Sequence, residues 1–519
     1  MSTTSTTVAP DGILLPGVPA IAAKGGNSPY LDVSSAFPST IAGVDDADMP
    51  TVRELLEVWR AKYPRNLIRS QYALAHEQLK DFGISIPQSI RTKVEAMIGW
   101  PAKAVRALAD LSVFEGFVFD GADDVYGLND MCDANGLDVV VPQTITSCYT
   151  HSCAFMTAST DPSDPRRVVF QPRSADWSAA LWDQEHRCIR AALTITSDDE
   201  YGRITGFNVW LPGHVYVCRG DILPWRADRV DSAYQGVAVV PFVYDPQLNR
   251  PFGRSRISRS LMALTDMGFR TMVRMEASAE FYSVPKLWFL GADRDAFSAD
   301  TWSSLISSIN AISKDEDDDV PTLQQITQAS MQPHSDMLKT IALLVASETN
   351  LPVNDLGITM DNPGSAEAMA AAERKLTREA DRQNKQFGRA LRDLMAIGVC
   401  LRENLDSPPD DLRKARPVWA PTQEISTTSR ADAFSKMAGA QPAFAQTEAG
   451  WRYAGFNRAD VAQILSAINA QKAGNVLDRL MELNTTTGGG DGGQQPDARP
   501  QPGGQAQPRA AGGGRRGAA

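Results

Sequence analysis

The stretch that decides the fold runs from Arg250 to Pro285 and reads RPFGRSRISRSLMALTDMGFRTMVRMEASAEFYSVP. Its apolar and small residues recur at steps of three and four, the spacing of one face of an α-helix. These positions are Ile257, Leu261, Leu264, Gly268, Met272, Met275, Ala279 and Tyr282. Pro285 predicts the end of the helix, because proline cannot continue one. A helix with so long an apolar stripe must bury it against another element.

The same stretch is rich in arginine, although the chain of 519 residues carries a net charge of −11. Only Asp266 offsets these charges inside the window that holds Arg254, Arg256, Arg259, Arg270 and Arg274. Arg270 and Arg274 are four residues apart and therefore share a helix face. Two interpretations stay open. The arginines contact nucleic-acid phosphates or acids of a neighbouring subunit, or they form ordinary ion pairs within the chain on a solvated face.

Downstream of the helix, the pattern predicts a small mixed segment and two more helices. Residues 287–290 (LWFL) and 323–326 are typical of strands, residues 302–312 of a helix, and residues 315–319 (DEDDD) form an acidic run. A helix is expected from Asp336 to Glu348, and Pro352 follows it. A loop rich in Gly, Pro and Asn at 351–364 then leads to a long helix over 366–404, with Ser365 as its expected N-cap.

Upstream, the chain predicts an α+β domain. Residues 1–48 are rich in Ser, Thr, Pro, Gly and Ala and favour a mobile arm. Helical spacing begins at Thr51, and a second helix is expected over 89–111, interrupted at Pro101. Residues 113–245 contain β-rich runs separated by turn signals, which predicts a largely antiparallel sheet; Val139-Val140-Val141 was assigned to one of these strands. Shorter helices are expected over 429–483, and the Gly-, Gln- and Pro-rich residues from 484 on should be disordered.

Composition bounds the class of protein. Hydrophobic residues make up 43% and charged residues 22%, close to the globular average. The acidic net charge argues against a general nucleic-acid coat, since tight phosphate binding needs clustered Lys and Arg. Six cysteines without a regular framework indicate a reducing compartment. We expect neither a signal peptide nor a membrane span, because the N-terminal apolar run is short and no stretch approaches eighteen apolar residues.

The motifs of common enzymes are missing. The sequence holds no Gly-Lys dipeptide, so a Walker A loop is excluded, and no G-x-S-x-G elbow. Cys148, His151 and Cys153, with His186 and Cys188, suggest a metal site, but their spacing fits no standard zinc site and buried core cysteines are the alternative. His76-Glu77 lacks the second histidine of a zinc protease, and the acidic run lacks the spacing of a calcium loop.

Three stretches resemble portal proteins of long-tailed phages, in particular those infecting high-GC Gram-positive bacteria. The first is the opening stretch, the second is Ile341-ALLVASETNLPVNDL-Gly357, and the third is Ser365-AEAMAAAERK-Leu376 leading into Phe387-GRA-Leu391. Weaker similarity lies at 113–117 and 135–138, and the resemblance covers roughly residues 50–405.

The resemblance implies an α+β portal fold in a ring-shaped homo-oligomer, usually a dodecamer. On this sequence it predicts a disordered arm at 1–48, an α+β wing at 49–254, a first stem helix at 255–284, a small α/β clip at 285–333, a second stem helix at 334–350, a tunnel loop at 351–364, a long wing helix with a return strand at 365–424, crown-like helices at 425–483 and a disordered tail at 484–519.

It also implies candidate residues for each role. The tunnel-loop candidates facing the DNA channel are Asn354, Asp355, Thr359, Asp361 and Asn362. The basic candidates of the stem are Arg256, Arg259, Arg270 and Arg274, and the clip candidates for contact with connector proteins are Trp288 and Trp302. Acidic side chains beside DNA would repel phosphates and keep friction low.

The implied function is mechanical and needs no cofactor, metal or catalytic residue. The ring would sit at one capsid vertex, nucleate capsid assembly, and carry double-stranded DNA in packaging and ejection. Its expected partners are further copies of the chain, the major capsid protein, a scaffold, the terminase large subunit and a head-tail connector protein, without a membrane. The protein would assemble in the host cytoplasm and remain in the virion. The alternatives are another head or minor capsid protein and a phage-encoded hydrolase.

Overall fold

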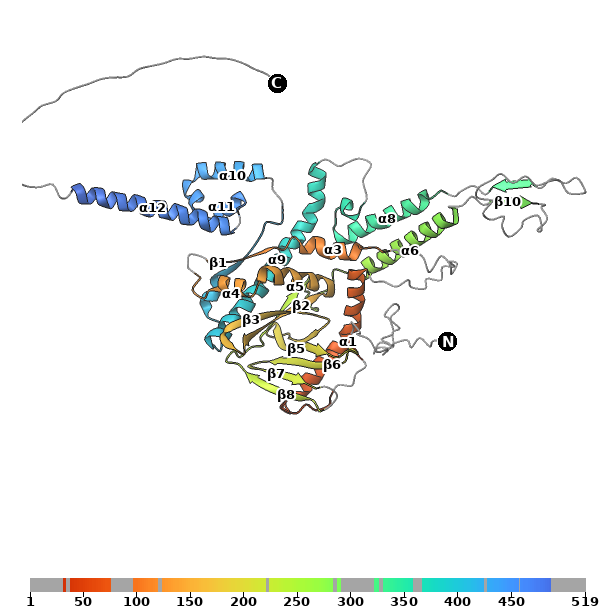
Figure 1. Ribbon diagram of the computed structural model, residues 1–519, viewed down its shortest axis with the longest axis horizontal. Helices are drawn as coiled ribbons and strands as arrows, with labels where there is room; N and C mark the ends of the chain where they lie inside the picture. Colours follow the sequence, from red (N-terminus) through yellow and green to blue (C-terminus); the bar gives the residue numbers. More distant parts are fainter. Residues whose placement is uncertain are drawn as a thin grey trace, which may run out of the picture. The chain divides into compact units, whose positions relative to one another are not determined.

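The computed structural model describes eleven stretches of the chain: 31–33, 38–75, 97–119, 124–220, 224–282, 287–290, 322–325, 330–357, 366–423, 427–456 and 458–486. The chain divides into two compact units, Met1–Glu424 and Ile425–Ala519. Both contain helices, and the described strands lie in the first unit (Figure 1). The fold is therefore mixed helix and sheet, as the sequence predicts.

The first unit is built around antiparallel sheets. The larger has the order β4-β5-β6-β7-β8, and a second sheet has the order β3-β2-β9. The strands of the larger sheet are β4 (Ser178–Asp183), β5 (Cys188–Asp198), β6 (Ile204–Leu211), β7 (His214–Arg219) and β8 (Arg226–Asp231). Those of the second are β2 (Cys153–Asp161), β3 (Asp164–Ser174) and β9 (Val239–Val243). Neighbouring strands pair antiparallel throughout, which confirms the predicted sheet type.

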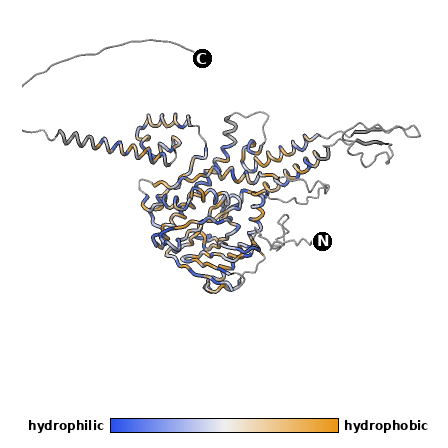
Figure 2. Tube along the Cα trace, in the orientation of Figure 1, coloured by the Kyte–Doolittle hydropathy of each residue, from blue (hydrophilic) through white to orange (hydrophobic). Residues whose placement is uncertain are grey.

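The larger hydrophobic core lies between the second sheet and three helices (Figure 1). The helices are α3 (Trp100–Ala109), α5 (Leu137–His151) and α9 (Ala366–Glu403). Phe387 on α9 is fully buried and stacks on Phe242 of β9 with ring centroids 5.8 Å apart. Two strands far apart in the sequence also pair in this unit: β1 (Phe114–Phe119) lies antiparallel to β12 (Ala415–Trp419). Figure 2 shows hydrophobic residues gathered inside this body.

A second core joins the larger sheet to α1 (Met49–Leu74). Trp59 of α1 is fully buried and its Nε1 donates to Asp176 O at 2.8 Å. Leu31 and Ile41 are also buried in this core, and Ala42 bridges to Arg226 of β8. The predicted mobile arm is therefore wrong for 31–33 and 38–48. Hydrogen bonds add to the apolar burial there, from Asp32 N to Gly202 O and from Ala42 N to Trp225 O. Residues 1–30 lie outside the described part.

The predicted strand at Val139-Val140-Val141 is wrong, because these residues belong to α5. Leu137, Val141, Ile145 and Cys148 recur at helical spacing and are buried in the larger core. β-Branched residues lower helix propensity by less than about 1 kcal/mol each, so tertiary burial outweighs the local preference.

Other local predictions are confirmed with small changes. The helix α6 spans Arg259–Tyr282, and Ser258 caps it, since its Oγ accepts from Leu261 N at 3.0 Å. Pro101 does not interrupt a helix. It occupies the first turn of α3, where its missing N–H has no helical partner to lose. The expected helix over 89–96 and the one over 302–312 lie outside the described residues.

Between α6 and α8 (Gln332–Thr349) the structure describes two short strands, β10 (Leu287–Leu290) and β11 (Thr322–Gln325), which pair antiparallel. This confirms both predicted strands of that segment. The long helix α9 has 38 residues and confirms the helix expected over 366–404. Among the described helices, none is both long enough and apolar enough to cross a membrane.

The second unit is helical, as predicted. It contains α10 (Thr427–Ala440), α11 (Glu448–Ala454) and α12 (Arg458–Thr486), with the 3-10 helix η4 (Pro442–Gln446) between the first two. Phe434 packs on Trp451 with ring centroids 5.0 Å apart. The helix α12 continues to Thr486, two residues past the expected start of the disordered tail, and residues 487–519 lie outside the described part.

Candidate functional site: the helix pair and its base

The helices α6 and α8 pack along each other and form the most exposed paired element of the first unit (Figure 1). Leu261, Phe269 and Val273 are buried on α6, and Ile341 and Val345 are buried on α8. Of the predicted stripe, Ile257, Leu261 and Gly268 are buried, so it is partly covered within the chain, while Phe269 and Val273 are buried outside it. On the outer side of α8, Met337, Leu343 and Leu344 stay 40%, 47% and 51% exposed.

At the base of the pair, Arg256 joins four segments of the first unit. Its Nη1 lies 2.8 Å from Glu379 Oε1 on α9, and its Nη2 donates to Thr349 O at the end of α8 at 2.7 Å. Its Nε donates to Ala104 O on α3 at 2.5 Å. Because the Arg256 and Glu379 side chains are only 4% and 10% exposed, water hardly screens this pair. We call Arg256, Glu379 and the groups they bind the arginine node.

Two further polar groups complete the arginine node. The Tyr244 hydroxyl donates to Glu379 Oε1, and Asn350 Nδ2 donates to Glu379 Oε2 at 3.3 Å. Burial, assisted by the Glu379 carboxylate, raises the pKa of Tyr244 to about 12. The tyrosine therefore remains a neutral donor near neutral pH. Asn350 adopts the left-handed conformation that ends α8, so the node also fixes the direction in which the chain leaves the helix.

For Arg256, the geometry favours the second interpretation, an ion pair within the chain, although this pair is buried and not solvated. The residue precedes α6 and is buried, so its charge is neutralised within the chain. The other three candidates lie on α6: Arg259 and Arg274 are exposed, and Arg270 is half-buried with its Nε 3.3 Å from Asp266 O. Spacing alone could not separate these cases. The residue that distinguishes Arg256 from the other arginines is its partner Glu379, and sequence reasoning did not connect the two.

Only some of the loop and insert candidates lie in the described part. Asn354 and Asp355 belong to a 3-10 helix, η2 (Val353–Leu356), with Asn354 exposed and Asp355 half-buried. Trp288 lies on β10 opposite Gln324 of β11. Thr359, Asp361, Asn362 and Trp302 lie outside the described residues.

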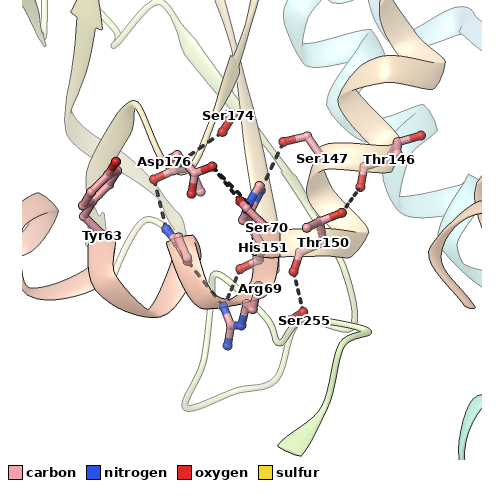
Figure 3. A network of polar contacts seen from close by, with 12 residues as sticks. Tyr63, Arg69, Ser70, Thr146, Ser147, Thr150, His151, Ser174, Asp176 and Ser255 are labelled. Atoms are coloured by element: carbon pink, nitrogen blue, oxygen red, sulfur yellow. Dashed lines mark hydrogen bonds and ion pairs between the residues drawn. The ribbon is translucent and has the colours of Figure 1, made fainter. Parts of the chain in front are cut away.

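A second polar network, around His151, was not predicted (Figure 3). Ser70 Oγ lies 2.8 Å from His151 Nε2, and Asp176 Oδ2 lies 3.2 Å from the same nitrogen. Ser147 Oγ lies 3.4 Å from the other ring nitrogen, Nδ1, so the imidazole of His151 has polar partners on both sides. This side chain is only 7% exposed, and Arg69 Nη1 donates to His151 O at 2.7 Å. The network therefore fastens α1 and α5 to the turn between β3 and β4.

The cysteines near His151 behave as core residues. Cys148 and Cys153 are buried, and burial raises the pKa of Cys153 to about 11. His186 pairs with Asp183 at 2.7 Å instead of approaching them. Within the stretches that the structure describes, no group of three potential metal ligands occurs. Of the two interpretations of these cysteines, burial in the core is the one that the geometry favours.

Comparison with known proteins finds similarity to phage portal proteins. The sequence profile described as "Phage portal protein, SPP1 Gp6-like" matches residues 58–470. A portal protein of Mycobacterium phage D29 is 28% identical over 382 residues, covering 71% of this chain and 78% of the relative. One from Mycobacterium phage L5 is 27% identical over 413 residues, covering 77% and 84%.

Among solved structures, the chain is similar to one described as the neck of a native GTA particle computed with C12 symmetry. The identity is 12% and the TM-score 0.40, over 65% of this chain and 85% of that one.

Proposed function

Because this chain belongs to the SPP1 Gp6-like family of phage portal proteins, we propose that it acts as a ring of copies around a channel for double-stranded DNA. Phage portal proteins are structural components of the virion, and the chain has a portal function and not an enzymatic one. We infer the ring, its position at one capsid vertex, and its division into stem, clip, tunnel loop, wing and crown from that membership and from the fold.

The observation that carries the proposal is the pair α6–α8 with a small insert between its helices. A stem and clip require two antiparallel helices with a small insert between them in the chain, and α6, the paired strands β10 and β11, and α8 follow in that order. We assign the stem to 255–284 and 334–350, which hold α6 and most of α8, the clip to 285–333 and the tunnel loop to 351–364. The wing is then the α+β body up to Arg254 together with α9 and β12, and the crown is residues 425–483.

The outer face of α8 supports assembly into a ring. Leu343 and Leu344 are adjacent and about half exposed, and Met337 lies seven residues before Leu344, on the same face. A neighbouring copy would bury this apolar surface, and repeated head-to-tail contacts close into a ring when the rotation permits it. We expect twelve copies in the ring, a dodecamer.

The DNA-facing residues follow from the same assignment. We propose Arg259, Arg270 and Arg274 as basic residues of the stem, and Asn354, Asp355, Thr359, Asp361 and Asn362 as tunnel-loop residues. Trp288 and Trp302 are proposed to meet a connector protein. The terminase large subunit would dock on the ring and supply the ATP chemistry, while the major capsid protein and scaffold surround it at assembly.

The alternatives are less well supported. Family membership gives no reason to assign the chain to another class of head protein. A hydrolase needs an accessible nucleophile aligned with a base, whereas the histidine ring that contacts Ser70, Ser147 and Asp176 is only 7% exposed.

Negative-stain imaging of the full-length protein tests the ring directly. Wild type should form rings with a central hole, and Leu343→Glu with Leu344→Glu should shift the population to monomers. The control is Leu248→Glu at a turn, 92% exposed. A wild-type protein that remains monomeric at high concentration and every salt condition would overturn the proposal.

A further inference from the structure

A second feature of the base is a cleft of about 530 Å³ beside the arginine node. Its walls come from the segment before α6, the end of α8 and the first half of α9. The size lies in the range of pockets that hold small ligands. Five cationic and two acidic side chains line it: Arg254, Arg256, Lys375, Arg378 and Arg382, with Glu348 and Glu379. We call it the cationic cleft.

Three of the five cations are already engaged by carboxylates. Arg256 pairs with Glu379, Arg254 lies 2.7 Å from Asp245, and Arg382 lies 3.7 Å from the same Asp245. The other acid of the lining, Glu348, accepts from Ser258 Oγ at 2.7 Å. The hydroxyl does not neutralise Glu348, and a single Asp245 serves two arginines. The five cations therefore exceed the carboxylates of Glu348, Glu379 and Asp245 by two charges.

Lys375 and Arg378 are both exposed, and neither has an ion-pair partner within the described stretches. They lie three residues apart on α9, and Arg382 follows four residues later, so the three share one face. The backbone carbonyl at the end of α8 would repel an anion, but Thr349 O already accepts from Arg256. The cleft therefore presents a net positive surface on a chain of net charge −11.

We propose that the cationic cleft binds a phosphate group, with Lys375 and Arg378 as its principal ligands and the DNA backbone as its source. Guanidinium groups bind phosphate oxygens in pairs, and an ammonium adds a compact charge. The inference rests on the proposed function, because Asn350, which lines the cleft, directly precedes the proposed tunnel loop. A duplex that follows this loop would bring its phosphates to the cleft.

The cleft places cations next to a tunnel loop whose acidic side chains are expected to repel DNA. Two unpaired charges for each subunit provide weak contacts that are repeated around a ring. Such contacts hold a duplex against sliding but release it readily when salt competes or force is applied.

The test uses a double variant, the cleft variant, that carries both Lys375→Gln and Arg378→Gln. It is compared with a control double variant that removes the same charge elsewhere. The control is Arg413→Gln with Lys414→Gln, where both side chains are exposed and pair with Asp410 and Asp411. Full-length protein is first imaged to establish that rings form. Binding of a fluorescent DNA duplex is then measured by anisotropy over a range of salt concentrations, and binding of inorganic phosphate by calorimetry.

The cleft variant should bind the duplex at least about tenfold more weakly at low salt, and its salt slope should fall by about 2 for each subunit engaged. The control should match wild type. Loss of phosphate binding without a change in duplex binding supports the cleft but makes free phosphate its source. Intact rings with no difference on either probe overturn the inference and leave the portal function standing. Rings lost only in the cleft variant also overturn it, because the cleft then joins neighbouring copies.

Discussion

The two ends of the arginine-rich stretch lie in opposite surroundings. At the base of the helix pair, Arg256 is buried and makes contacts with α3, α8 and α9. Farther along, on α6 itself, Arg274 is exposed. The residues are of one type and eighteen positions apart, yet the first stabilises the fold and the second is available to a partner.

The difference teaches where a stem can be altered. A buried arginine that satisfies two carbonyls and a carboxylate is costly to remove, since its partners lose their hydrogen bonds without regaining water. An exposed arginine contributes little to stability, so evolution is free to use it for contact. The base of the pair should therefore be rigid and the outer length adaptable.

The largest expected effect comes from Arg256→Met, which keeps the bulk of the side chain and removes its charge. Glu379 would remain buried without its cation, and Thr349 O and Ala104 O would lose a donor. We expect the free energy of unfolding of the full-length protein to fall by about 3–5 kcal/mol. Chemical denaturation followed by circular dichroism measures it.

Arg259→Met is the matched control for this change, because Arg259 is exposed and three residues away. It should change the unfolding free energy by less than about 0.5 kcal/mol. Equal losses in the two variants would mean that the arginine node does not hold the pair to the body.

A smaller effect is expected where α6 touches α3. A Cβ at Gly268 would lie 2.6 Å from Trp100 Cζ3 and 3.0 Å from Ile98 Cδ1. Gly268→Ala should therefore destabilise the protein by about 1–3 kcal/mol through overpacking, although alanine is the better helix former by about 1 kcal/mol.

Gly474→Ala on α12 provides the control, because nothing lies within 4 Å of its Cβ position. There the helix propensity acts alone and should stabilise the helix by about 0.5–1 kcal/mol. The two variants are compared by thermal unfolding. Stabilisation by Gly268→Ala would show that α6 is not packed on Trp100 in solution.

The sequence predicts elements well where one face alternates regularly, and it fails where tertiary contacts decide. The helices α6, α8 and α9 follow from their spacing, and β5, β6 and β7 of the large sheet follow from their β-rich runs, whereas β4 and β8 were not expected. The valines at 139–141 mislead because burial in the larger core outweighs their local preference. Arg256 misleads for a related reason: its partner Glu379 is 123 residues away in the chain, and no local pattern announces that pairing.

The smallest effect on stability is expected from a double variant with Arg259→Gln and Arg274→Gln. This variant tests whether the exposed arginines of α6, unlike the buried Arg256, leave the stability of the fold unchanged. Both side chains are exposed, and no ion-pair partner is found for either among the residues described. The unfolding free energy should stay within about 0.5 kcal/mol of wild type, and rings should form. If these arginines contact DNA, particles assembled with the variant should contain less DNA, as measured by their buoyant density. A stability loss as large as that of Arg256→Met would instead place them in a structural role. Intact rings and full particles would show that the outer length of α6 carries its charge for some contact other than DNA.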